Sequence, residues 1–355
     1  MVCQRVPLMA MQLLICATRG NCKIFEPLPD QPCFGQAPCL HTTASARVSS
    51  ECMRKIWEGD WQNEDAATAT MPLLGKTMSI TPLGLSNRFL SKHDMQCDIA
   101  DVLLLSPSAE VEKRLTDAKE RHLLARLQGL RNKLWLTIGT SVDHRSTRFC
   151  ELLFGRRREF IQNDINFDFC IFERLNFTMM YTFQDGFSTT ASSRNATQQR
   201  LRFSKLKMSL KANGWQPSFL TMAGVEWDFK HWFDARAEPD FDAIRPTIQM
   251  QIRAARHAWP TLLGIFLRTQ YSSDSYTFNR AHVQQYNNIL HSFQPRNMSN
   301  PCASIFIADM AKLMRHNGTR ASGWTDGLHP APWVTLQYVG LCANALADLG
   351  ELCSP

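Results

Sequence analysis

Two short segments of this chain carry the residue types of a serine-based active site. Residues 139–141 read Gly-Thr-Ser, and residues 326–329 read Asp-Gly-Leu-His. A serine hydroxyl is a weak nucleophile until a neighbouring base takes its proton. In a loop, the spacing lets Asp326 orient the imidazole of His329 while the other ring nitrogen faces outward as a general base. Ser141, Asp326 and His329 are therefore the candidate catalytic residues.

Each segment also fits a purely structural role when taken alone. A serine after a glycine commonly caps a helix, and an Asp-x-x-His pair can be a capping carboxylate with an incidental surface histidine. The chain has ten histidines, so one such pair is unremarkable. His231 is a rival base, but no carboxylate stands near it at the Asp-x-x-His spacing. Taken alone, neither segment decides between the catalytic and the structural interpretation.

The residues around Ser141 predict a strand, a tight turn and a helix. An apolar run at residues 134–138 leads into Gly139, and residues 142–154 can form a helix. Glycine allows the sharp bend, and the first backbone N–H groups of a helix can hold a developing oxyanion. The backbone N–H of Ser141 is one candidate donor, and a glycine such as Gly186 is another.

Alternating strands and helices predict an α/β fold around a mostly parallel sheet that is covered on both faces. The expected strands are residues 134–138, 167–172, 177–181, 219–223, 262–267 and 305–307. The expected helices are residues 106–130, 142–154, 244–258, 280–293 and 331–350. Functional residues of such sheets lie at the carboxyl ends of the strands.

The first third of the chain is expected to be less regular. Residues 1–17 resemble a signal peptide or a weak membrane anchor, because their apolar run is too short to span a bilayer comfortably. Residues 18–50 fit an irregular stem. Residues 51–350 are expected to form the main domain, with a loop-rich cap at 51–105 and the α/β core at 106–350.

Cysteines and glycosylation signals favour the secretory pathway, either the Golgi lumen or secretion. The chain has twelve cysteines without Cys-x-x-Cys spacing, which suits disulfides in an oxidising compartment. Four Asn-x-Ser/Thr sequons begin at Asn176, Asn195, Asn297 and Asn317. The alternative is a cytosolic protein with reduced thiols and a buried N-terminal segment.

The net charge of +7 gives a mildly basic surface that favours an acidic partner such as an anionic polysaccharide or a membrane surface. The sequence has one tight basic run, at residues 156–158, and it lacks the basic repeats and zinc-finger spacing of nucleic-acid binders. We therefore expect no nucleic-acid partner, and membrane contact only through the N-terminal anchor.

Six sequence blocks resemble the PC-esterase branch of the SGNH (GDSL-type) hydrolases, which includes the trichome-birefringence-like polysaccharide O-acetyltransferases. The resemblance spans about residues 51–350. Its blocks are IWEGDW at 56–61, LWLTIGTSVDHR at 134–145, GVEWDFKHW at 224–232, FLRTQY at 266–271, FNRAHVQQYN at 278–287 and DGLHPAPW at 326–333.

The resemblance implies a three-layer α/β/α, flavodoxin-like SGNH domain with an irregular N-terminal cap. It also implies a Ser-His-Asp triad at Ser141, His329 and Asp326. The expected activity is that of a carbohydrate acyl-esterase or O-acetyltransferase, with a polysaccharide or glycan substrate and, for transfer, an acetyl donor. No cofactor is expected. The alternative is a non-catalytic carbohydrate-binding descendant of the fold.

The chain departs from the family pattern in two places. Thr140 stands where the family usually has the Asp of Gly-Asp-Ser, and Met222 and Ala223 precede Gly224 where an Asn is usual. The first change affects the turn more than the chemistry. The second removes an amide from the expected oxyanion site.

Three further residues are candidates for substrate binding: Trp227, Asp228 and Arg268. An aromatic ring beside polar groups at a strand end suits stacking on sugars, and Arg268 could hold a sugar or acyl oxygen. The alternative is a core tryptophan, a capping aspartate and an arginine in a structural ion pair. No group of His and carboxylate residues has a recognised metal spacing, so the expected chemistry needs no metal.

Overall fold

The structure is a computed structural model that describes residues 124–149, 155–187, 195–272, 279–295, 302–314, 328–330 and 332–353, together with four short strands nearer the N-terminus. The expected signal peptide or anchor, the expected stem and most of the helix expected at 106–130 lie outside these residues. The region expected to be a loop-rich cap contains four strands: β1 (Gly59–Asn63) pairs antiparallel with β4 (Asn87–Ser91), and β2 (Thr70–Leu73) with β3 (Lys76–Ser79).

A seven-stranded sheet forms the centre of the fold, with the order β11-β10-β9-β5-β8-β7-β6. The five strands from β11 to β8 are parallel, and β7 runs antiparallel to both of its neighbours. The strands are β5 (Leu134–Gly139), β6 (Gly155–Gln162), β7 (Ile165–Phe172), β8 (Phe177–Phe183), β9 (Phe219–Met222), β10 (Gly264–Arg268) and β11 (Ser304–Ala308). The mostly parallel sheet predicted from the sequence is confirmed.

The parallel strands follow the flavodoxin-like order 2-1-3-4-5, in which β5 is the first strand and β8 the second. The chain leaves β5 towards β8 on one side and later returns to β9 on the other. The carboxyl end of β5 therefore lies at the point where the strand order reverses, which is where ligands bind in open α/β sheets.

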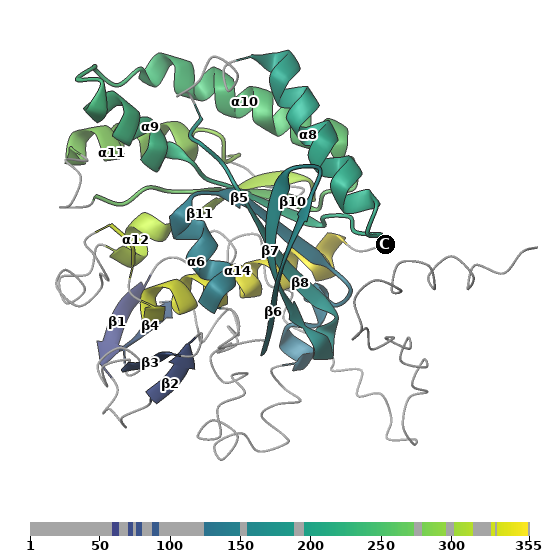
Figure 1. The fold of residues 1–355 in the computed structure, drawn as a ribbon. Helices are drawn as coiled ribbons and strands as arrows, with labels where there is room; N and C mark the ends of the chain where they lie inside the picture. The colour runs from purple at the N-terminus through teal and green to yellow at the C-terminus, as the bar shows by residue number, and fades with distance from the viewer. Residues whose placement is uncertain are drawn as a thin grey trace, which may run out of the picture. The chain divides into compact units, whose positions relative to one another are not determined.

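Helices cover both faces of the sheet (Figure 1). One face carries α8 (Ala196–Lys211), α9 (Val225–Asp234), α10 (Phe241–Ala258) and α11 (Arg280–His291), whose apolar residues share a core with β5, β9 and β10. The other face carries α6 (Ser141–Phe149), α12 (Met310–Met314) and α14 (Pro332–Cys353). The protein thus has the three-layer α/β/α architecture expected from its sequence.

Strand β5 illustrates why the sequence folds in this way. All six of its residues are buried, as expected for a strand covered by helices on both faces. Leu136 and Ile138 belong to one core and Trp135 to the other, which follows from the two-residue period of a strand. The indole N–H of Trp135 donates a 2.8 Å hydrogen bond to Thr221 on β9. Both faces of β5 are therefore fixed by packing.

All six expected strands are present, and four of the expected helices appear as α6, α10, α11 and α14. Among the α-helices and strands described between residues 124 and 353, four were not expected: β6, α8, α9 and α12. Helix α8 was not expected because the helical periodicity of its apolar residues is weak. Few of its sixteen side chains are buried, and the apolar residues Leu201 and Met208 are exposed. Helix α9 lies in the block expected to hold substrate-binding residues, and β6 begins with the basic run at 156–158.

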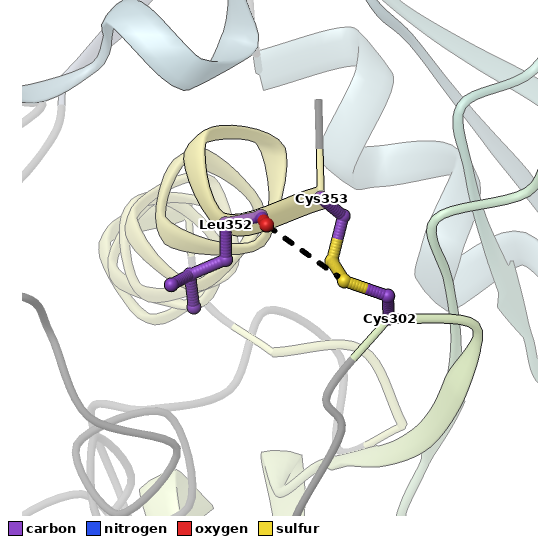
Figure 2. The surroundings of a disulfide bond; sticks show 3 residues. All are labelled: Cys302, Leu352 and Cys353. Carbon is purple, nitrogen blue, oxygen red and sulfur yellow. Dashed lines mark hydrogen bonds between the residues drawn. A yellow bond between two sulfur atoms is a disulfide. The ribbon is translucent and has the colours of Figure 1, made fainter. Parts of the chain in front are cut away.

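A disulfide joins Cys302, just before β11, to Cys353 at the end of α14 (Figure 2). Cys170 on β7 is also disulfide-bonded, and Cys342 is free and buried. Of the four sequon asparagines, Asn176 and Asn195 fall within the described residues and both are exposed. Within the described part of the chain, no helix has the length and apolar character needed to span a bilayer.

Candidate active site

Ser141 is the first residue of α6, two positions after the end of β5, and its side chain is exposed. Its Oγ lies 2.9 Å from Nε2 of His329, although 188 positions separate the two residues in the chain. The segment that carries His329 is tied to the sheet by the Tyr271 hydroxyl, which donates a 3.0 Å hydrogen bond to the carbonyl of Leu328. The structure thus brings the expected nucleophile and the expected base into hydrogen-bonding contact, whereas Asp326 lies outside the described residues.

The turn before Ser141 is organised by Asp143. Its Oδ2 accepts a 2.9 Å hydrogen bond from the backbone N–H of Thr140, and the Thr140 hydroxyl lies 3.4 Å from the same oxygen. A Cβ on Gly139 would come within 2.4 Å of this carboxylate, so only glycine fits there. Asp143 therefore stabilises the turn that precedes Ser141.

Asp143 is in turn held by a buried arginine. The Nε of Arg268 donates to Oδ1 of Asp143 at 2.6 Å, and one terminal nitrogen of Arg268 donates to both Asp143 and Glu226. All three side chains are almost fully buried. The expectation that Arg268 binds substrate is therefore wrong: its guanidinium is engaged in a structural ion pair beneath the nucleophile turn.

The pKa values of Glu226 and Arg268 are both raised, the first by burial and the second by neighbouring charges. Burial raises the pKa of Glu226, repulsion from Asp143 adds to the rise, and Arg268 opposes it. Burial disfavours the charge on Arg268, but Asp143 and Glu226 together raise its pKa well above the ordinary value. The Oε2 atom of Glu226 is buried without a hydrogen-bond partner.

The loop after β8 is hydrogen-bonded to the end of β5, next to the turn that precedes Ser141. The backbone N–H of Gln184 donates to the carbonyl of Gly139 at 2.6 Å, and the Gln184 side chain donates to the carbonyl of Gly186 at 3.2 Å. Gly186 has φ +65°, a conformation that favours glycine. A Cβ on Gly224 would lie 2.9 Å from the amide nitrogen of Gln184 and 3.4 Å from Gly186.

The contacts of Gln184 change which groups are candidates for the expected oxyanion site. An amide side chain is present beside Gly224 after all, but it comes from Gln184 in the loop after β8 and is itself fully buried. Its role in the structure is to hold the conformation of the loop at Gly186. The N–H of Ser141, at the start of α6, stays the best-placed candidate donor, because the first N–H groups of a helix have no partner within it.

Asp228 was expected to contact substrate, and the structure corrects this. Its side chain is completely buried, and Oδ2 accepts a 2.7 Å hydrogen bond from the backbone N–H of Phe187. A carboxylate in that position ties α9 to the loop after β8 instead of reaching a ligand. Trp227, the neighbouring candidate, is only partly buried, and its ring lies 5.8 Å from the Phe183 ring and 6.1 Å from the His231 ring.

A second histidine lies one helical turn after the nucleophile. His144 Nε2 is 2.7 Å from Oδ2 of the buried Asp168 on β7, and its ring stacks on Tyr181 at 4.7 Å. Glu159 lies opposite Asp168 on β6, and one ligand atom from each of His144, Glu159 and Asp168 falls within 4.8 Å of the others. These three residues could hold a metal ion, but the contact between His144 and Asp168 pairs both groups without one.

Sequence reasoning missed Asp143, Gln184, Glu226 and the pair of His144 with Asp168. For Asp143 a signal was present, since a carboxylate three residues after Thr140 is the spacing of a side chain that caps the first turn of a helix. The other residues come from different strands and helices. Their proximity follows from the strand order, which local spacing does not encode.

The comparisons with known proteins find structural similarity only at low sequence identity. No protein-family model matches the chain, and no curated protein matches it either. Among solved structures, it is similar to a carbohydrate esterase family 3 protein from Talaromyces cellulolyticus, with a TM-score of 0.40 and 13% identity over 62% of this chain and 100% of that one.

Two further solved structures are similar at the same level of identity. A protein described as a GDSL-like lipase from Parabacteroides merdae gives a TM-score of 0.36 and 13% identity, over 61% of this chain and 97% of that one. The acetylxylan esterase Axe2 from Geobacillus stearothermophilus gives 0.35 and 13%, over 63% and 96%. We therefore base the function on the geometry of the site itself.

Proposed function

We propose that this protein is a serine-dependent acyl-esterase that acts on carbohydrate esters, with transfer of the acyl group to a sugar hydroxyl as a variant of the same reaction. The observation that carries the proposal is the 2.9 Å contact between Ser141 Oγ and His329 Nε2. This is the distance that a general base needs in order to take a proton from a serine hydroxyl.

The reaction follows the course of other serine acyl enzymes. His329 takes the proton from Ser141, and Oγ attacks the carbonyl carbon of the ester. The oxyanion is stabilised by N–H groups at the start of α6. When the intermediate collapses, the carbon–oxygen bond to the sugar breaks, and His329 returns its proton to the leaving oxygen. Water or another sugar hydroxyl then accepts the acyl group by the same steps in reverse.

Asp326 completes the proposed triad. Its position three residues before His329 allows its carboxylate to orient the imidazole and to stabilise the charged form of the ring during the reaction. The carbohydrate substrate and the acetyl group are proposed from the resemblance to the PC-esterase branch. The blocks that carry this resemblance include the segments of Ser141 and His329.

A small activated ester tests the proposal directly. We expect the purified protein to release p-nitrophenol from p-nitrophenyl acetate, and Ser141→Ala to lower kcat by at least about a thousand-fold. Ser146→Ala changes a serine one turn further along α6 and is the matched control. Equal rates for wild type and Ser141→Ala would remove Ser141 from the mechanism and overturn the proposal.

Hydrolysis and transfer are distinguished by the fate of the acyl group. A radiolabelled acetyl donor is incubated with the protein in the presence and absence of an oligosaccharide. Label that moves to the oligosaccharide in a Ser141-dependent manner identifies a transferase, whereas label found only as free acetate identifies an esterase.

A non-catalytic glycan-binding protein is the second candidate. It is favoured by Thr140 in place of the family's aspartate and by Met222 and Ala223 in place of its amide. The hydrogen bond from Thr140 to Asp143 weakens the first argument, because the turn keeps a carboxylate partner. Glycan binding without any Ser141-dependent turnover of esters would decide for this candidate.

We also propose that the protein matures in the secretory pathway. The disulfide between Cys302 and Cys353 and the exposed positions of Asn176 and Asn195 support this proposal. Sensitivity of the expressed protein to an endoglycosidase, abolished by Asn176→Gln together with Asn195→Gln and the two remaining sequon variants, is the test.

A further inference from the structure

Two aromatic side chains lie next to the carboxyl ends of the strands that flank β5. Phe183 is the last residue of β8 and pairs with Gly139, the last residue of β5. Trp227 lies in the first turn of α9, which follows β9 on the other side of β5. Since β5 lies between β8 and β9, the two rings approach each other from opposite sides of the nucleophile strand.

The contact between these rings places them over the carboxyl end of β5. Their centroids are 5.8 Å apart in an edge-to-face arrangement. The segments that follow β8 and β9 are each hydrogen-bonded to β5. The N–H of Gln184, after β8, donates to the Gly139 carbonyl, and the N–H of Ala223, after β9, donates to the Ile138 carbonyl. Ser141 follows two positions after Gly139, so the aromatic pair and the nucleophile share one edge of the sheet.

This pair is open to solvent and has a polar rim. Phe183 is 48% exposed, which is unusual for a phenylalanine at the end of a buried strand. His231, one turn after Trp227, lies 3.7 Å from the carboxylate of Asp185, and both of these side chains are about half exposed. The surface therefore combines an exposed aromatic face with a carboxylate and an imidazole beside it.

We propose that Phe183, Trp227, Asp185 and His231 form a subsite for a sugar ring next to the scissile ester. The C–H face of a pyranose stacks on the aromatic rings, and its hydroxyls hydrogen-bond to Asp185 and His231. A purely apolar ligand, such as a long acyl chain, fits less well because it would desolvate these two polar groups without replacing their hydrogen bonds. The inference deepens the proposed function and rests on it for the placement of the ester.

The first experiment measures binding without chemistry. Ser141→Ala protein is titrated by calorimetry with xylotetraose, cellotetraose and chitotetraose. We expect at least one of them to bind, and Phe183→Ala or Trp227→Ala in the same background to weaken that binding about ten-fold. Trp227→Phe keeps a ring and should retain most of the affinity. Phe233→Ala, which removes another exposed aromatic of α9, is the matched control.

The second experiment separates the subsite from the reaction. In the protein with Ser141 intact, Phe183→Ala and Trp227→Ala should raise KM for the acetylated tetrasaccharide about ten-fold while p-nitrophenyl acetate is turned over as by wild type. A loss of both activities would mean that the aromatic pair maintains the catalytic turn and would overturn the subsite.

Failure of the subsite and failure of the proposed function give different results. If none of the three tetrasaccharides binds, or if Phe183→Ala binds them as Phe233→Ala does, the subsite is wrong whatever the esterase assay shows. If Phe183-dependent binding is present and Ser141→Ala has no effect on ester turnover, the subsite stands and the enzyme proposal falls.

Discussion

At the scale of single residues, the site depends on a buried network that supports the nucleophile turn. Thr140 stands where the family that the sequence blocks resemble usually has an aspartate, and Asp143 accepts a hydrogen bond from the backbone N–H of Thr140. Arg268 in turn forms ion pairs with both Asp143 and Glu226. A turn that carries a nucleophile is precise only if the residues around it are themselves fixed.

Replacing Arg268 tests this network. Arg268→Leu leaves two buried carboxylates without their cation, so we expect a loss of about 3–5 kcal/mol in the free energy of unfolding. Arg253→Leu removes an arginine from an exposed position on α10 and is the matched control. Urea denaturation of both variants gives the comparison. Equal stability of the two proteins would show that the guanidinium contributes nothing to the fold.

Glu226 should make stability depend on pH. Burial raises its pKa above the ordinary 4.5, so the folded protein holds the proton at pH values where the unfolded chain has lost it. The resulting stabilisation is complete below the ordinary pKa and is lost as the pH rises through the folded-state value. Glu226→Gln cannot titrate but can still accept a hydrogen bond from Arg268.

We therefore expect wild type to lose stability relative to Glu226→Gln as the pH rises from about 4.5 towards neutrality. Urea unfolding of both proteins across this range measures the difference at each pH. A difference that stays constant with pH, or that changes in the opposite direction, would contradict the raised pKa.

At the scale of elements, α14 is placed by a close backbone crossing. It packs on the short helix η3 (Gln128–Leu130), where Gly129 and Gly350 meet. A Cβ on Gly350 would lie 2.0 Å from the carbonyl oxygen of Gly129, and a Cβ on Gly129 would lie 1.9 Å from the carbonyl oxygen of Ala347. Glycine at both positions allows the C-terminal helix to seal one face of the sheet.

Gly350→Ala should consequently destabilise the protein although alanine is the better helix former. Helix propensity alone would stabilise α14 by about 1 kcal/mol. The added methyl group collides with backbone, and such overpacking costs about 1–3 kcal/mol beyond any gain. Thermal unfolding should show a lower Tm for Gly350→Ala. A higher Tm would indicate that the two backbones can separate without loss of packing.

At the scale of the whole molecule, the strand order brings together residues that are distant in the sequence. Ser141 follows the first strand of the sheet and His329 precedes the last helix, yet their side chains are in contact. The disulfide between Cys302 and Cys353 fastens this last helix to the chain just before β11 (Figure 2). It therefore restrains the helix whose N-terminal end begins close to His329.

Loss of this disulfide should lower global stability. For the sequence separation of 51 residues, the chain-entropy relation gives a contribution of about 4 kcal/mol. Cys302→Ser together with Cys353→Ser should show this loss in urea denaturation, and Cys342→Ala, which removes a free buried thiol, is the control. Wild-type stability in the double variant would mean that the crosslink does not restrain the unfolded chain.

The sequence by itself determined the elements of the sheet core and singled out Ser141 and His329, whose side chains are in contact in the structure. Apolar runs such as residues 134–138 specify buried strands because a strand covered on both faces must be apolar on both. The glycine before Ser141 and the Asp-x-x-His segment are local patterns that the sequence displays directly, and the resemblance of the surrounding blocks singled them out as candidates.

Only the tertiary structure decided which polar side chains face a ligand. Arg268 and Asp228 are binding candidates by type, but the fold buries both of them against partners from other elements. Phe183 and Trp227 become neighbours only because β8 and β9 flank β5. The physical reason is that burial and pairing are set by contacts between distant segments, and these contacts form only when the strand order is established.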